Sequence, residues 1–114
     1  MKKTDQTVEA KILRQIGKRV TFVYPEGPKK GYLKDRTFIH SPGSTTVPYW
    51  DVVDLIEFPS EIEAKWIRIG YYRKPKDRLV FASQTTITEP IETWKELLSQ
   101  AAKEKAWFRE LVEH

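Results

Sequence analysis

Cationic and aromatic side chains lie close together in the sequence along residues 65–78. Proteins use this combination of side chains to bind nucleic acids. Six basic residues and one acidic residue occur in this segment, together with one tryptophan and two tyrosines. Lysine and arginine neutralise phosphates, and flat rings stack on bases. The segment therefore predicts a surface that contacts DNA or RNA.

A second basic stretch extends the predicted contact surface. Residues 18–36 carry six basic and two acidic groups, including adjacent lysines between two glycines. The residues predicted to contact nucleic acid are Arg68, Tyr72, Arg73, Lys74, Lys76, Lys29 and Lys30. The cations would bind phosphates and Tyr72 would stack on a base. Basic hairpin tips also keep proteins soluble and blunt sheet edges, so the alternative interpretation is a set of solvated turn charges.

Between these stretches lies an acidic segment. Residues 47–63 contain no basic residue and five acidic ones, namely Asp51, Asp54, Glu57, Glu61 and Glu63. The pattern Pro48-Tyr49-Trp50-Asp51 followed by Glu63-Ala64-Lys65 resembles that of the PD-(D/E)xK metal-dependent nucleases, with two residues between the proline and the aspartate. The resemblance implies magnesium held by Asp51 and Glu63, with Lys65 supporting the attacking water. The alternative for these residues is a solvated acidic edge strand.

Other chemistries are disfavoured by the residues present. The chain has no cysteine, which excludes disulfides and thiolate metal sites, and its two histidines, His40 and His114, are far apart. Adjacent His40 and Ser41 would point to opposite faces of a strand, which argues against serine catalysis. We therefore predict a non-catalytic protein without a cofactor or a resident metal, and we keep a small magnesium-dependent nuclease as an alternative.

Hydrophobic periodicity predicts a helix, five strands and a second helix. The first helix carries an apolar stripe from Val8 to Ile16 and stops at Gly17. Strands are predicted at 20–24, 32–40, 49–58, 65–73 and 78–88, with turns at 26–31 and 74–77 and a bulge or helical turn near 52–54. One long helix is predicted from Pro90 to Glu113.

This order predicts an α+β fold over a single domain, 1–114. The expected sheet is five-stranded, antiparallel and strongly bent, with the short N-terminal helix and the long C-terminal helix packed on it. The run Val20–Tyr24 followed by Gly31-Tyr32-Leu33 resembles the opening hairpin of small SH3-like barrels. The resemblance implies a small-barrel sheet.

Composition sets the expected location and partners. Neither a secretory leader nor an apolar run long enough to span a membrane is found, so we expect a cytoplasmic protein that does not bind membranes. The absence of asparagine and cysteine beside many Lys, Arg and Glu residues is typical of thermophile proteins. DNA or RNA is the expected partner. The alternative is a protein-interaction adaptor that uses the acidic segment and Trp107, and the sequence leaves the oligomeric state open.

Overall fold

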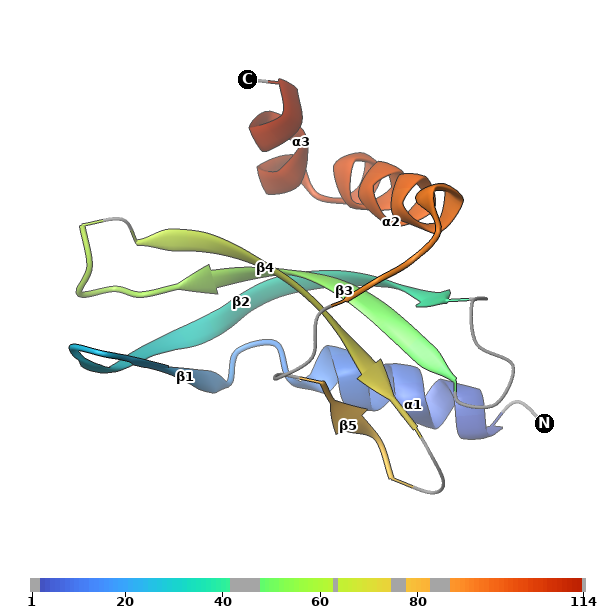
Figure 1. Ribbon diagram of the computed structural model, residues 1–114, viewed down its shortest axis with the longest axis horizontal. Coiled ribbons are helices and arrows are strands. Elements are labelled where there is room, and N and C mark those ends of the chain that lie inside the picture. The colour runs from blue at the N-terminus through green and yellow to red at the C-terminus, as the bar shows by residue number, and fades with distance from the viewer. Residues whose placement is uncertain (1–2, 42–47, 63, 75–77, 83–86, 114) are drawn as a thin grey trace. The chain divides into compact units, whose positions relative to one another are not determined.

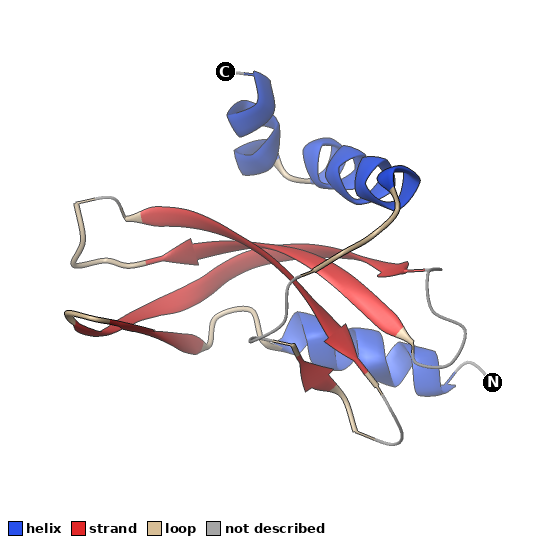
Figure 2. Ribbon diagram, in the orientation of Figure 1, coloured by secondary structure: helices blue, strands red, loops and turns tan. Residues whose placement is uncertain are grey.

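The computed structural model describes residues 3–41, 48–62, 64–74, 78–82 and 87–113 of the chain. Within these described residues, three helices and five strands follow one another (Figure 1): α1 (Lys3–Arg14), β1 (Arg19–Tyr24), β2 (Gly27–Ser41), β3 (Tyr49–Glu57), β4 (Lys65–Arg73), β5 (Val80–Phe81), α2 (Ile91–Glu104) and α3 (Ala106–Glu113). The strands form one antiparallel sheet in the order β1-β2-β3-β4-β5. Figure 2 shows that helices precede and follow the strands along the chain. The predicted α+β class is therefore confirmed.

The chain divides into two compact units, which are described separately below. Unit 1 comprises residues 1–36 and 54–68, and unit 2 comprises residues 37–53 and 69–114. Strands β2, β3 and β4 contribute residues to both units. The prediction of a single domain stays a prediction. In the part of the chain that the structure describes, no helix is both long and apolar enough to cross a membrane.

Unit 1 is built around a small aliphatic and aromatic core. Leu33, Ile56 and Phe58 are buried, and Ile16, Val20 and Phe22 pack against them. Gly17 follows α1 with a φ of 94°, as expected of the predicted helix stop, and its N–H donates to the Leu33 carbonyl at 2.6 Å. These contacts connect α1 to the β1–β2 hairpin.

The first turn is much shorter than the sequence predicts. Strand pairing reaches Tyr24 and Gly27, so residues 28–31 belong to β2 and the predicted turn at 26–31 is wrong. Gly27 does mark the turn, with a φ of 125°. Gly31 has a different role, because a Cβ atom there would lie 2.6 Å from the Glu57 carbonyl oxygen. That glycine permits close packing between backbones inside the sheet.

β3 is the most deeply buried strand. Every residue from Trp50 to Ile56 is buried. Because neighbouring side chains of a strand point to opposite faces, both faces of β3 are buried here. The paired apolar residues that suggested a bulge or helical turn at 52–54 therefore reflect burial on both faces of a continuous strand.

Strand β5 contains only Val80 and Phe81, which is shorter than the predicted 78–88. Residues 83–86 of that prediction lie outside the described residues, as do residues 75–77 of the predicted turn. The preceding strand, β4, has the predicted bounds. It pairs with β5 through Tyr72 opposite Phe81 and Arg73 opposite Val80.

The predicted long C-terminal helix is two helices that are interrupted at Lys105. This residue is extended, with φ −122° and ψ 114°, and no proline or glycine causes the break. The Arg109 guanidinium donates to the carbonyls of Ala102 and Lys103 at 2.8 and 3.0 Å. These carbonyls belong to the last turn of α2, where helical partners are absent, so Arg109 satisfies groups that the break leaves unpaired.

Polar contacts join α2 to β2 within unit 2. The Gln100 side-chain amide donates to the Phe38 carbonyl at 2.6 Å, and the Thr37 hydroxyl donates to the Glu104 carboxylate at 2.7 Å. The buried residues of the two C-terminal helices are Thr93, Leu97, Ala101 and Phe108. Ile91, the first residue of α2, is 72% exposed. The buried face of these helices therefore excludes this apolar side chain.

Candidate functional site

One predicted nucleic-acid contact, Arg68, belongs to a buried ion cluster in unit 1. Arg36 on β2, Asp54 on β3 and Arg68 on β4 lie on three neighbouring strands. Both Asp54 oxygens accept hydrogen bonds from Arg36, at 2.7 and 2.9 Å, and one of them also accepts two from Arg68, at 3.0 and 2.8 Å. Asp54 and Arg36 are fully buried as side chains, whereas Arg68 is 23% exposed.

This cluster ties α1 to the sheet. A further guanidinium nitrogen of Arg36 donates to the Ile12 carbonyl at 2.8 Å, within the last turn of α1. The Arg68 guanidinium also lies over the Phe22 ring, 5.7 Å from its centre. Buried charges are tolerated when they are paired and hydrogen-bonded in this way. The contacts give Arg68 a structural role in unit 1, and its predicted binding of phosphate stays a prediction.

Lys29 is also paired. Its ammonium lies 3.2 Å from the Glu61 carboxylate, and its side chain is 28% exposed. Lys34 is 60% exposed and lies 3.6 Å from Glu57. Glu61 therefore neutralises Lys29, whereas the longer and more exposed contact with Glu57 leaves Lys34 accessible to solvent.

Lys30 lies on an exposed basic and aromatic face of the β1–β2 hairpin. Arg19 on β1 is opposite Tyr32 on β2 in the strand register, so their side chains share one face. Lys30 and Lys34 are two residues to either side of Tyr32, which places them on that face as well. All four are exposed, and Tyr32 is exposed to 41%. We call Arg19, Lys30, Tyr32 and Lys34 the hairpin face.

The predicted contact set contained only Lys30 of this face and missed its other three members, Arg19, Tyr32 and Lys34. In the structure, residues 28–34 alternate between exposed and partly or fully buried positions. The interpretation of residues 26–31 as a turn hid that alternation. A strand beginning at Gly27 would have placed Lys30, Tyr32 and Lys34 on one side.

The other predicted contacts lie in unit 2 at the end of β4. Arg73 is exposed, whereas Tyr72 is half-buried with its ring 4.9 Å from that of Phe81. Lys74 is half-buried, and its backbone N–H donates to the Pro48 carbonyl at 3.2 Å. Lys76 lies outside the described residues. The predicted set is therefore divided, with Lys29, Lys30 and Arg68 in unit 1.

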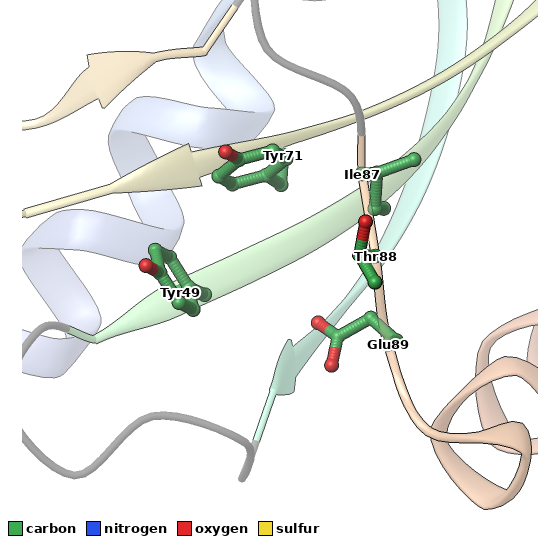
Figure 3. A pocket seen from close by; sticks show the side chains of 5 residues that line it. All are labelled: Tyr49, Tyr71, Ile87, Thr88 and Glu89. Atoms are coloured by element: carbon green, nitrogen blue, oxygen red, sulfur yellow. The ribbon is translucent and has the colours of Figure 1, made fainter.

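Unit 2 contains a pocket that sequence analysis did not predict. It has a volume of about 200 Å³ and is lined by Tyr49, Tyr71, Ile87, Thr88 and Glu89. The two tyrosine rings meet edge to face, with centres 5.3 Å apart and planes at 85°. Figure 3 shows the Glu89 carboxylate extending from the chain before α2 toward the side where the rings lie. We call this the tyrosine–carboxyl pocket.

Backbone hydrogen bonds position the two tyrosines of this pocket. Tyr49 begins β3, and the preceding residue, Pro48, accepts a hydrogen bond from Lys74 just after β4. The Tyr71 carbonyl accepts one from Ala82 just after β5, at 2.9 Å. The pocket walls are therefore fixed by strand pairing at both tyrosines.

A buried carboxyl group lies next to the pocket. Asp51 is two residues after Tyr49 on β3, and it is 1% exposed. Neither of its oxygens accepts a hydrogen bond from an N–H or O–H group of the described chain, and its neighbour is the carboxyl group of Glu89. The two carboxyl groups can hydrogen-bond to each other only if one holds a proton.

The environment of Asp51 strongly disfavours its charged form. Burial, and then the hydrogen bond to Glu89 and the charge of Glu89, raise the pKa of Asp51 from 3.8 to about 8. Perturbed carboxyl groups beside a cavity are common at binding and catalytic sites. This environment makes the pocket the strongest candidate site in unit 2.

The residues suggested by the nuclease resemblance are not assembled in either unit. Asp51 belongs to unit 2 and Lys65 to unit 1, and Glu63 lies outside the described residues. Among the described residues, no cluster of three or more histidine, aspartate or glutamate side chains could hold a metal ion. We derive no hydrolytic step from this geometry.

The tryptophan suggested as an adaptor contact lies on α3. Trp107 is half-buried and meets the Phe108 ring edge to face, with centres 6.3 Å apart. Phe108 is itself buried. Trp107 therefore packs partly against its own unit, and its role in protein contacts stays a prediction.

Known proteins give no direct indication of function. Comparisons with models of protein families, with curated proteins and with solved structures found no match to this chain. Function is therefore inferred from the side chains of the two units.

Proposed function

We propose that this protein is a non-catalytic nucleic-acid-binding or accessory module that binds single strands through the hairpin face. One observation carries the proposal: Tyr32 is 41% exposed on a sheet surface that also presents three exposed cations. Arg19 lies opposite it in the register, and Lys30 and Lys34 lie on either side along β2.

The residue types on this face match the two parts of a single nucleic-acid strand. Arginine and lysine neutralise phosphates, and an exposed tyrosine ring stacks on a base whatever its identity. Stacking of this kind needs an unpaired base, because the faces of bases within a duplex are already stacked. We therefore expect preference for single strands over duplexes and little discrimination between sequences.

Fluorescence anisotropy with labelled single strands of about 15 nucleotides, near the upper end of known single-strand site sizes, tests this proposal. DNA, RNA and duplex probes are compared across a salt series. Three phosphate contacts predict a slope of log affinity against log salt of about −2 for single strands. Tyr32→Leu should weaken binding by about fivefold to a hundredfold through lost stacking.

A matched pair of charge reversals separates a defined face from general positive charge. Lys30→Glu removes one expected phosphate contact and should reduce the salt slope. Lys11→Glu makes the same charge change at an exposed position on α1 and should leave the slope unchanged. Equal losses in the two variants, or no binding by the unmodified protein at low salt, would disprove the proposal.

Arg73→Glu tests the predicted contacts in unit 2. This residue is exposed at the end of β4, outside the hairpin face. A loss of affinity as large as that of Lys30→Glu would extend the binding surface to the predicted residues of unit 2. An unchanged affinity would restrict binding to the hairpin face.

A further inference from the structure

We propose that the tyrosine–carboxyl pocket binds a primary ammonium group, as found on a lysine side chain or at the end of a polyamine. This site is independent of the proposed nucleic-acid contact. The pocket belongs to unit 2 and the hairpin face to unit 1, and they share no residue. Either proposal can therefore fail without the other.

The aromatic walls suit a cation. The faces of aromatic rings carry partial negative charge, and ammonium groups bind over them. Tyr49 and Tyr71 meet at 85°, so their rings present surfaces in two directions at one corner of the pocket.

The polar lining supplies acceptors for the three N–H groups of an ammonium. Glu89 lines the pocket and offers a carboxylate, and the adjacent Thr88 offers a hydroxyl oxygen. None of the five lining residues is basic. These residues would therefore attract a positively charged ligand, and no cation among them would compete with it for the acceptor oxygens.

Asp51 gives an independent reason to expect a cation. Buried polar atoms are almost always hydrogen-bonded, yet neither carboxyl oxygen of this residue accepts a hydrogen bond from an N–H or O–H group of the described chain. Its neighbour, Glu89, is another carboxyl group, which adds repulsion when both are charged. A bound ammonium would compensate the negative charge of Asp51 and Glu89, whereas no residue that lines the pocket carries a positive charge.

The pocket volume limits the size of the ligand. About 200 Å³ is many times the space that a single water molecule requires. It is smaller than the pockets of roughly 300–1,000 Å³ that hold drug-sized molecules. A short alkyl chain that ends in an ammonium group fits between these limits.

Titration with n-butylammonium, followed by the NMR signals of the tyrosine rings, tests the proposal. This probe reproduces the end of a lysine side chain, and 1-butanol serves as its neutral counterpart. We expect saturable shifts at Tyr49 and Tyr71 with n-butylammonium and much weaker binding of 1-butanol. Equal binding of both would show an apolar crevice and overturn the proposal, as would no saturable shift up to about 0.1 M, far above a millimolar dissociation constant.

Substitutions then test the assigned roles. Glu89→Gln should weaken n-butylammonium binding at least about tenfold, since it removes a charge-assisted hydrogen bond. Glu96→Gln is the matched control, because Glu96 is an exposed glutamate on α2 and its replacement should leave affinity unchanged. Equal effects of the two substitutions would overturn the role of Glu89.

The aromatic contribution has its own pair of variants. Tyr71→Leu should weaken binding by about twofold to thirtyfold, and Tyr71→Phe should retain most of it because the ring remains. If Glu89→Gln does not fold, this pair and the comparison with 1-butanol still decide the outcome. Equal losses in both Tyr71 variants would remove the ring from the site.

Two further probes distinguish the sources of the ammonium. Putrescine represents a polyamine, and Nα-acetyllysine amide represents a lysine of a partner protein. Tighter binding of putrescine would assign the pocket to polyamines, and tighter binding of the lysine amide would assign it to a basic protein segment. Failure of both to displace n-butylammonium would overturn the biological assignment.

Discussion

Replacing Asp51 by asparagine should change how stability depends on pH. In the unfolded chain this carboxyl group loses its proton near its ordinary pKa of 3.8, whereas in the folded protein burial and Glu89 hold the pKa at about 8. Between these values the folded state binds more protons than the unfolded state. The free energy of unfolding therefore falls as the pH rises through this window.

The size of the effect follows from the two pKa values. A shift of about four units corresponds to roughly 5–6 kcal/mol of stability lost once the pH is above the folded pKa. Between about pH 5 and pH 8 the same values predict a loss of about 3–4 kcal/mol. The carboxyl group is 1% exposed, so solvent screening reduces this figure little. An asparagine side chain cannot ionise, and the Asp51→Asn variant should therefore lose most of this dependence.

Urea unfolding followed by tryptophan fluorescence measures these free energies across the pH range. The unmodified protein should become less stable from pH 5 to pH 8, and Asp51→Asn should be the more stable of the two at the upper end. His40 stacks on Trp50, but both proteins contain this pair, so its effect on the fluorescence cancels in the difference. A wild-type stability that rises with pH, or equal slopes in the two proteins, would refute the burial of an ionisable Asp51.

Three further predictions test the fold. Asp54→Asn leaves buried Arg36 without its charge partner and should cost about 3–5 kcal/mol in urea unfolding, whereas Glu57→Gln, which breaks an exposed pair, should cost less than about 1 kcal/mol. Similar costs would contradict the buried cluster. Gly31→Ala should lower the melting temperature by several degrees, corresponding to about 1–3 kcal/mol, because its Cβ would clash with a backbone oxygen. An unchanged melting temperature would contradict the close packing there. Arg109→Leu should speed amide hydrogen exchange in the last turn of α2, because two carbonyls lose their donors. Unchanged exchange would show that Arg109 does not stabilise this end.

Local pattern was sufficient to predict the helices and strands whose signals are short-range. The bounds of β4 follow from the β-branched and aromatic run of Lys65–Arg73, and α1 ends near the predicted glycine stop. These signals depend on residues a few positions apart, and any sequence with the same spacing has them. The α+β class followed from their order along the chain.

Local pattern does not reveal the contacts that a glycine or a lysine makes with distant residues. Gly31 resembles a turn residue, but its function is to admit the Glu57 backbone inside the sheet. Lys29 resembles a solvated or ligand-binding cation, yet it pairs with Glu61, thirty-two positions away. A local sequence pattern does not indicate which distant residue will contact a given side chain in the folded protein.

The sequence by itself determined that this chain forms an α+β protein with antiparallel strands, because hydrophobic periodicity acts over a few residues. Only the tertiary structure decided which charges are paired inside the protein and which remain at its surface. Arg36 and Arg68 both pair with Asp54 because three neighbouring strands bring them together. Burial, together with Glu89 placed next to it from far along the chain, raises the pKa of Asp51 beside an aromatic pocket. Burial and electrostatics depend on distances in space, and these are set by packing of the whole unit.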